Sequence, residues 1–85
     1  MDKIHANFLR KCKEAKSLEN VSNDDMLLLY SYYKQATVGN NETTKPSIFS
    51  FKQTAKWNAW NAQIGLSKEN AMTNYIELVK NLQQN

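Results

Sequence analysis

Apolar residues recur at helical spacing in four separate segments of the chain. In the first segment, Ile4, Phe8, Cys12 and Ala15 stand three or four residues apart, which predicts a helix over about residues 2–16 with one narrow apolar stripe. No segment shows the alternation of a half-buried strand, and two glycines and one proline are too few for a turn-rich β protein. The pattern therefore predicts an all-α protein.

Serines and glycines mark the limits of the three further helices. Ser22 is a good N-cap for a second helix that we expect to end at about residue 38, before Gly39. A third helix is expected over about residues 51–64, and a fourth from its N-cap, Ser67, to about residue 83.

A stretch of turn-forming residues, NNETTKPSIFS, separates the second and third helices and contains the one proline, Pro46. About a dozen extended residues reach roughly 40 Å, whereas a helix of about 16 residues is roughly 24 Å long. The loop can therefore run back along the second helix and start the third in the same direction, which a short loop would forbid. We expect a four-helix bundle with a long loop between helices two and three.

The second helix carries large apolar groups on two faces, although a surface helix normally has one polar face. Both faces should therefore be covered, and one cover can be a ligand. One arc contains Leu28, Leu29, Tyr32 and Ala36, and the other contains Met26, Leu27, Tyr30, Tyr33, Lys34 and Thr37.

Tyr30 and Lys34 stand four residues apart, so they are neighbours on the helix surface and their hydroxyl and ammonium groups can converge on one anion. The alternative is a core aromatic beside a lysine that keeps its charge in water, and spacing alone favours it. Spacing likewise favours core packing for Trp57 and Trp60 and a solvated face for the third-helix lysines.

Composition sets the class of protein. Eighty-five residues make one domain spanning residues 1–85, and a single cysteine, Cys12, excludes an internal disulfide. The start lacks the apolar run of a signal peptide, and no stretch reaches the length of a membrane span, so we expect a cytoplasmic protein with no stable membrane insertion. The net charge of +3 suits an anionic ligand but is modest for a nucleic-acid-binding protein.

Catalytic patterns are absent from the sequence. No paired carboxylates stand among apolar residues, and no Cys-His or Ser-His-Asp set has a plausible orienting group. His5 and Cys12 lack the further ligands that a zinc site needs, and two isolated glycines make no phosphate-binding loop. We expect a binding protein rather than an enzyme, with no metal and no cofactor.

Several motifs together resemble the acyl-CoA-binding protein family: MLLLYSYYKQATVGN, KPS, AKWNAW and SKENAMTNYIELV, within about residues 8–82. The resemblance implies an up-down-down-up bundle of four helices. It also implies a monomer that binds, pools and transports medium- and long-chain fatty acyl-CoA thioesters inside the cell without catalysis, with transient contact to enzymes that use them.

The resemblance further implies a set of ligand-binding residues, most of them on the second and third helices. Tyr30, Lys34 and Lys56 match residues at the ribose 3′-phosphate of coenzyme A, and Lys52 matches a further lysine of the site. The full set is Lys16, Met26, Leu27, Tyr30, Ser31, Tyr32, Tyr33, Lys34, Lys52, Lys56 and Tyr75.

The remaining matches concern the nucleotide and the acyl chain. Tyr33 and Tyr75 match aromatic residues that line the nucleotide pocket, and Lys16 matches a first-helix lysine near the adenine. Met26 and Leu27 match apolar residues that shield the acyl chain.

The chain also departs from the family pattern at a few positions. Asn40 stands where an acidic residue is common, Ser47 where glycine is common, and Ala15 where valine is usual. The proline common before the second helix is missing. These departures concern the shape of the loops and the fit of the acyl chain, and none removes a head-group contact.

Two other functions are compatible with parts of the pattern. Met26, Tyr30 and Tyr33 would be the contact residues of a helical module that binds a partner protein. Lysines and tyrosines also occur in nucleic-acid-binding proteins, but the modest net charge argues against this class, and we expect no nucleic-acid partner.

Overall fold

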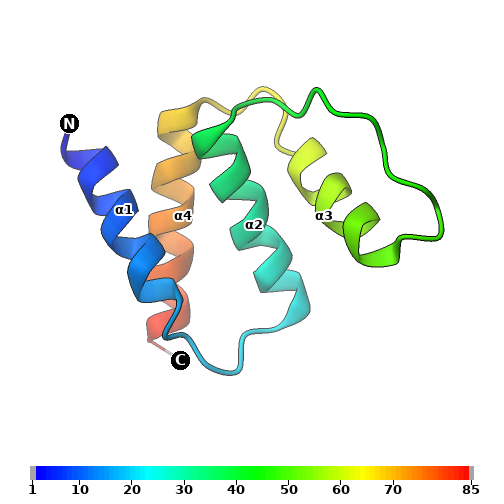
Figure 1. The fold of residues 1–85 in the computed structure, drawn as a ribbon. Helices are drawn as coiled ribbons and strands as arrows, with labels where there is room; N and C mark the ends of the chain where they lie inside the picture. The colour runs from blue at the N-terminus through cyan, green and yellow to red at the C-terminus, as the bar shows by residue number, and fades with distance from the viewer. Residues whose placement is uncertain (1, 85) are drawn as a thin grey trace.

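The computed structural model describes residues 2–84, and these residues form four α-helices and no β-strand (Figure 1). The helices are α1 (Lys3–Ala15), α2 (Asn23–Thr37), α3 (Phe51–Asn61) and α4 (Lys68–Gln83). The all-α prediction is therefore confirmed. The third helix is shorter than expected, because hydrogen bonds from Gln63 N to Trp60 O and from Ile64 N to Asn61 O tighten residues 62–65 into turns.

Side chains cap three of the four helices at their N-termini. The Oγ atom of Ser22 accepts a hydrogen bond from the Asp25 N–H at 3.1 Å, and that of Ser67 accepts from the Asn70 N–H at 3.0 Å, so both predicted N-caps are confirmed. The side chain of Asp2 caps α1 in the same way. Gly39 follows α2 with a φ of 100°, a conformation that strains any residue with a side chain.

The helices lie side by side in a thin layer, with principal extents of 37 × 29 × 16 Å. Helix α1 packs on α4, α4 on α2, and α2 on α3 (Figure 1). Residues 38–50 leave the end of α2, run past α3 and turn back into it, so α2 and α3 point in the same direction. The up-down-down-up order and the parallel third helix are as predicted.

The apolar core lies between α1, α2 and α4. Phe8 and Val79 are 1% and 0% exposed, and the other buried members are Leu29, Ala36, Ala71 and Tyr75. Cys12 packs against this cluster, as expected for a small core residue. Burial of these side chains holds three of the helices together.

Helix α3 is attached to α2 by a different set of contacts. Trp60 is buried, and its indole N–H donates to the Gly39 carbonyl at 2.8 Å. The Gln63 amide donates to the Oγ atom of Ser31 at 3.1 Å, and the Ser31 hydroxyl donates to the Leu28 carbonyl at 2.7 Å. One buried aromatic ring and a chain of hydrogen bonds therefore fix α3 in place.

Asn40, one of the departures from the family pattern, ties the ends of α2 and α3 together. Its side-chain oxygen accepts hydrogen bonds from the Gln35 amide at 2.9 Å and from the Gly65 N–H at 3.0 Å. Gln35 is 1% exposed and also donates to the Leu66 carbonyl at 2.8 Å. Both contacts of Asn40 use an acceptor, so an acidic side chain would serve the same purpose.

We expect Asn40→Ala to lower the free energy of unfolding by about 1–3 kcal/mol, because a buried amide donor loses its partner. Asn40→Asp retains both acceptor positions and should stay within about 1 kcal/mol of the original chain. Urea unfolding followed by circular dichroism measures both values. Equal losses for the two variants would contradict the acceptor role.

Candidate functional site

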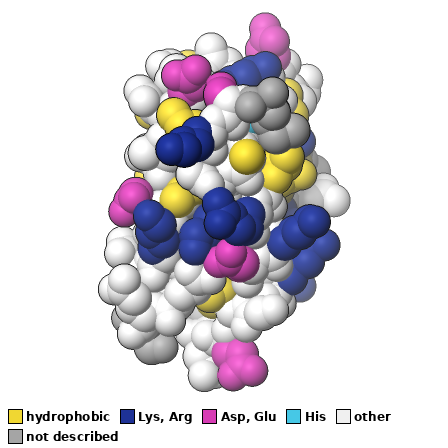
Figure 2. Space-filling view, turned by 90° about the vertical axis from the view of Figure 1, so that its left-hand side faces the viewer, with side chains coloured by type: hydrophobic (Ala, Val, Ile, Leu, Met, Phe, Trp, Pro, Cys, Tyr) yellow, Lys and Arg dark blue, Asp and Glu magenta, His cyan; other side chains and the backbone are white. Residues whose placement is uncertain are grey.

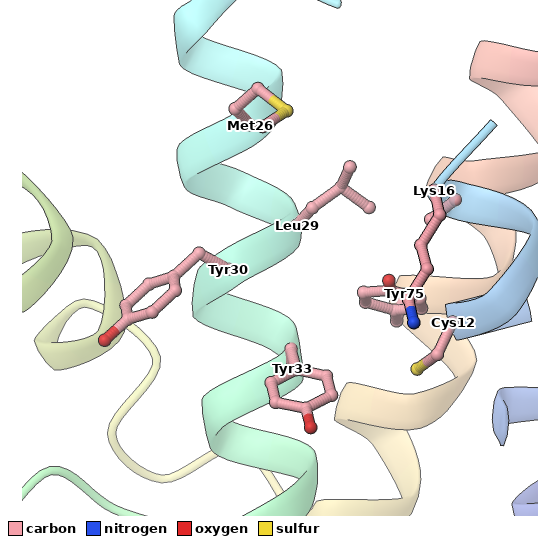
Figure 3. Close-up of a pocket in the computed structure, with 8 residues that line it drawn as sticks. Cys12, Lys16, Met26, Leu29, Tyr30, Tyr33 and Tyr75 are labelled. Carbon is pink, nitrogen blue, oxygen red and sulfur yellow. The ribbon is translucent and has the colours of Figure 1, made fainter. Parts of the chain in front are cut away.

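A hollow of about 280 Å³ opens between α2 and the adjoining helices α1 and α4 (Figure 3). The view shows Leu29 pointing toward α1, whereas Tyr30 points to the opposite side. The hollow is lined by Cys12, Ala15, Lys16, Met26, Leu29, Tyr30, Tyr33 and Tyr75. Five of the predicted ligand-binding residues therefore meet here, although they come from α2, from α4 and from the C-cap of α1.

The rings of Tyr33 and Tyr75 line this first hollow, and the buried ring of Phe8 packs against both. The rings of Phe8 and Tyr75 meet edge to face, with centroids 5.1 Å apart, and the rings of Phe8 and Tyr33 are stacked at 6.1 Å. Tyr75 is buried, whereas Tyr33 remains 44% exposed. The wall thus offers an open aromatic face that is supported from behind by the core.

Burial affects the protonation of two titratable groups that line this hollow, Tyr75 and Cys12. It raises the pKa of the Tyr75 hydroxyl, and the adjacent Cys12 thiol raises that pKa further. Burial also raises the pKa of the Cys12 thiol, while its hydrogen bond with Tyr75 acts in the opposite direction to a smaller extent. Both groups therefore stay neutral at physiological pH, and Tyr75 keeps a hydroxyl proton to donate.

A second hollow, of about 240 Å³, lies between α2, α3 and the long loop. The indole N–H of Trp57 donates to the carbonyl and hydroxyl oxygens of Thr43, at 3.2 and 3.0 Å, and so holds the loop against α3. The hollow is lined by Tyr30, Thr43, Thr44, Pro46, Gln53, Lys56, Trp57 and Trp60. Tyr30 lines both hollows and forms the ridge between them.

Two predicted site lysines lie over aromatic rings near this ridge. The Nζ atom of Lys56 is 5.3 Å from the ring centroid of Tyr30, and that of Lys34 is 4.7 Å from the ring centroid of Trp60. The ion pairs within residues 2–84 join Lys11 to Glu14 and Lys80 to Glu77. In that part of the chain the site lysines consequently have no carboxylate partner.

Positive charge is not confined to this region. On the face that carries α1, Lys and Arg side chains gather across the middle of the molecule (Figure 2). The distribution of charge alone thus does not locate an anion site. Lys34 and Lys56 lie over aromatic rings beside the hollows, and Lys45 lies in the same way over Trp57, with its Nζ atom 5.8 Å from the ring centroid.

The remaining predicted site residues lie outside both hollows. Ser31 is fully buried, and its hydroxyl is engaged by Leu28 and Gln63. Tyr32 packs against the core cluster, and Leu27 is half-buried. Lys52 is exposed on α3, one turn before Lys56. Their predicted ligand contacts stay predictions.

The two faces expected for helix two are only partly as predicted. Leu29 and Ala36 are buried on the core side, but the other buried residues are the polar Ser31 and Gln35, which face α3 and the loop. The arc with Met26 and Tyr33 is left open: Met26 is 55% exposed and Tyr33 44% exposed. We expected this arc to be covered by either protein or ligand. Because the described residues leave it open, a ligand is the remaining candidate.

Sequence reasoning missed most of the second hollow. Its loop residues, Thr43, Thr44 and Pro46, carry no pattern that marks them as lining residues. Its α3 residues do carry a signal, because Gln53, Lys56, Trp57 and Trp60 recur at helical spacing on one face. Trp60 is buried as expected, whereas Trp57 is half-buried at the edge of the hollow.

Within residues 2–84, no group of three or more His, Cys, Asp or Glu side chains is arranged to hold a metal ion. In the same part of the chain, none of the helices combines the length and the apolar character needed to cross a membrane.

Comparison with known families and sequences gives a consistent result. The family model described as "Acyl CoA binding protein" matches residues 5–79. An acyl-CoA-binding protein of Gossypium hirsutum is 56% identical over 80 residues, which are 93% of this chain and 90% of that protein. Acyl-CoA-binding domain-containing protein 3 of Oryza sativa subsp. japonica is 48% identical over 82 residues, and there the chain spans only 53% of the relative's length.

Solved structures with similar folds include two acyl-CoA-binding proteins. The crystal structure of Oryza sativa acyl-CoA-binding protein 2 superposes with a TM-score of 0.93 at 48% identity, covering 95% of this chain and 91% of that one. The crystal structure of the protein from Moniliophthora perniciosa gives a TM-score of 0.88 at 34% identity, covering 99% and 82%.

The half-buried position of Cys12 predicts low thiol reactivity. Its raised pKa leaves less thiolate at pH 8, so alkylation by iodoacetamide should be severalfold slower in the folded protein than in the same chain unfolded in urea. The rate should rise with pH around a midpoint above about 8.5, the value of a free thiol. Equal rates for the folded and unfolded chains would contradict the position of Cys12 in the wall of the first hollow.

Proposed function

This chain belongs to the acyl-CoA-binding protein family, and we propose that it binds medium- and long-chain fatty acyl-CoA thioesters and carries them without catalysing a reaction on them. In this proposal the protein acts as a monomer in the cytoplasm, where it pools its ligand and passes it to the enzymes that use it. In this proposal it takes no cofactor, binds no nucleic acid and does not insert stably into a membrane.

The observation that carries the proposal is the open arc of α2. Met26 and Tyr33 are about half exposed although they stand beside a packed core, and Tyr30 forms a ridge between two hollows. A ligand with apolar and aromatic parts would remove this surface from water, at about 25 cal/mol per Å² of apolar area. Fatty acyl-CoA has both parts.

The lysines near the ridge support a phosphate partner. A lysine over an aromatic ring gains about 0.5–1 kcal/mol where the pair is exposed and about 2 kcal/mol where it is desolvated, whereas each hydrogen bond to a charged group contributes about 1.5–3 kcal/mol. A phosphate between Lys34 and Lys56 would therefore draw both ammonium groups away from the rings of Trp60 and Tyr30. We assign this position to the 3′-phosphate, with the Tyr30 hydroxyl as a further donor.

The first hollow suits the nucleotide. Tyr33 presents an open ring, Tyr75 keeps its hydroxyl proton, and Lys16 lines the same space from the end of α1. An adenine ring stacked on this wall would gain about 0.5–1.5 kcal/mol beyond its buried area. The Lys16 ammonium would then face the polar edge of the base.

The acyl chain would follow the apolar side of the same helix. Met26 is exposed beside the first hollow, and Leu27 is half-buried one position further along α2. Each methylene that leaves water contributes about 0.8 kcal/mol. By this reckoning the phosphate fixes the position of the ligand, and the chain supplies much of the affinity.

Titration calorimetry with palmitoyl-CoA, coenzyme A and palmitate tests the whole proposal. We expect palmitoyl-CoA to bind most tightly, because free coenzyme A lacks the chain and palmitate lacks the nucleotide. Palmitate that binds as tightly as palmitoyl-CoA would contradict the proposed function.

The phosphate role of Lys34 has its own test. Lys34→Ala should weaken the binding of palmitoyl-CoA about tenfold or more, through loss of a charged hydrogen bond. The same substitution should affect the 3′-dephospho analogue much less. Lys80→Ala is the control, because Lys80 pairs with Glu77 and lines neither hollow. Equal losses for the two ligands would refute the phosphate assignment.

A further inference from the structure

Three large apolar side chains project into water where the long loop meets α3. Ile48, Phe49 and Phe51 are 73%, 82% and 79% exposed, and they are the most exposed large apolar residues in the described chain. We call them the apolar tip. They line neither hollow, so the proposed acyl-CoA site does not account for them.

A defined turn holds the apolar tip outward. The Oγ atom of Ser47 accepts a hydrogen bond from the Phe49 N–H at 3.3 Å, and the Ser47 carbonyl accepts from the Ser50 N–H at 2.9 Å. The Thr54 hydroxyl donates to the same carbonyl at 3.2 Å, which joins the turn to the first turn of α3. These hydrogen bonds fix the backbone of the turn, which holds the three side chains in positions exposed to solvent.

The apolar tip lies at the edge of the layer farthest from α1 (Figure 1). Among the helices of the described chain, α3 packs on α2 alone, so no neighbouring helix encloses this edge. The tip is a group of exposed side chains on a turn. It does not form a groove into which a peptide or helix would bind. Protruding apolar residues on a loop suit insertion into a soft surface.

The positive charge around the tip indicates that its binding partner is an anionic surface. Lys45 and Lys52 flank the tip in the sequence and are exposed, and the Nζ atom of Lys45 lies 5.8 Å from the ring centroid of Trp57. No Asp or Glu occurs between Thr43 and Lys68 in the sequence. Aromatic residues beside lysines match the boundary of an anionic bilayer, where the rings enter the acyl region and the ammonium groups meet lipid phosphates. A second copy of this chain would instead bring the same positive charge to the contact.

We propose that the apolar tip docks the protein on anionic phospholipid surfaces, with Ile48, Phe49 and Phe51 at the acyl boundary and Lys45 and Lys52 at the headgroups. This contact goes beyond the proposed acyl-CoA binding and does not depend on it. The docking is peripheral and reversible, since three side chains and two lysines form a small anchor.

Sedimentation with lipid vesicles tests the proposal on the full chain. The protein should bind vesicles of phosphatidylcholine mixed with phosphatidylserine, and bind vesicles of phosphatidylcholine alone much more weakly. The double variant Phe49→Ser/Phe51→Ser should lose about tenfold or more of the partition onto mixed vesicles, because the buried apolar area is lost. Lys45→Glu should lose about fivefold or more.

Ile64→Ser is the control. Ile64 is 53% exposed just beyond the opposite end of α3, and its replacement removes exposed apolar surface away from the tip. It should leave vesicle binding unchanged. Equal losses for Ile64→Ser and for the tip variant would overturn the proposal, as would equal binding of the original chain to the two kinds of vesicle.

Two further measurements separate the alternatives. The tip variant should bind palmitoyl-CoA in solution as the original chain does, and a loss there would place the tip in the ligand site and overturn the proposal. Absence of vesicle binding together with tip-dependent self-association in sedimentation velocity would assign the surface to a second copy. Failure of palmitoyl-CoA binding in the original chain would overturn the proposed function alone.

Discussion

The packing of α2 against two different neighbours is the constraint on which the rest of the structure depends. On one side Leu29 and Ala36 join the apolar core with α1 and α4, and on the other Ser31 and Gln35 make hydrogen bonds to α3 and to the residues that follow it. Helix α3 contacts no other helix in the described chain. If α2 moved, the core and the attachment of α3 would therefore change together.

A helix with two neighbours in a thin layer keeps part of its surface open. In α2 the open part is occupied by Met26, Tyr30 and Tyr33 rather than by the charged residues usual at such positions. The hollows on the two sides of Tyr30 exist because α1 and α3 stand apart, with α2 between them. The proposed ligand thus takes the place that another helix would occupy in a thicker bundle.

The helices follow from local sequence, since serine caps, terminal glycines and helical spacing act over a few residues. The parallel course of α3 follows from loop length. The attachment of α3 was not predictable, because Ser31 meets Gln63 and Gln35 meets the Leu66 carbonyl across about 30 residues. For the same reason spacing alone favoured a core role for Tyr30: only the positions of α1 and α3 show that its side of α2 is open.

Residues 38–50 combine several roles in one segment. Their length lets α3 run parallel to α2, Thr43 and Pro46 line the second hollow, and the apolar tip closes the segment at the start of α3. Two hydrogen bonds join the segment to α3, one from Trp57 to Thr43 beside the second hollow and one from Thr54 to Ser47 beside the apolar tip. The loop and α3 therefore form one unit that is held to the rest through α2.

A membrane contact at the tip, as proposed, would bring the surface of the bilayer next to the wall of the second hollow.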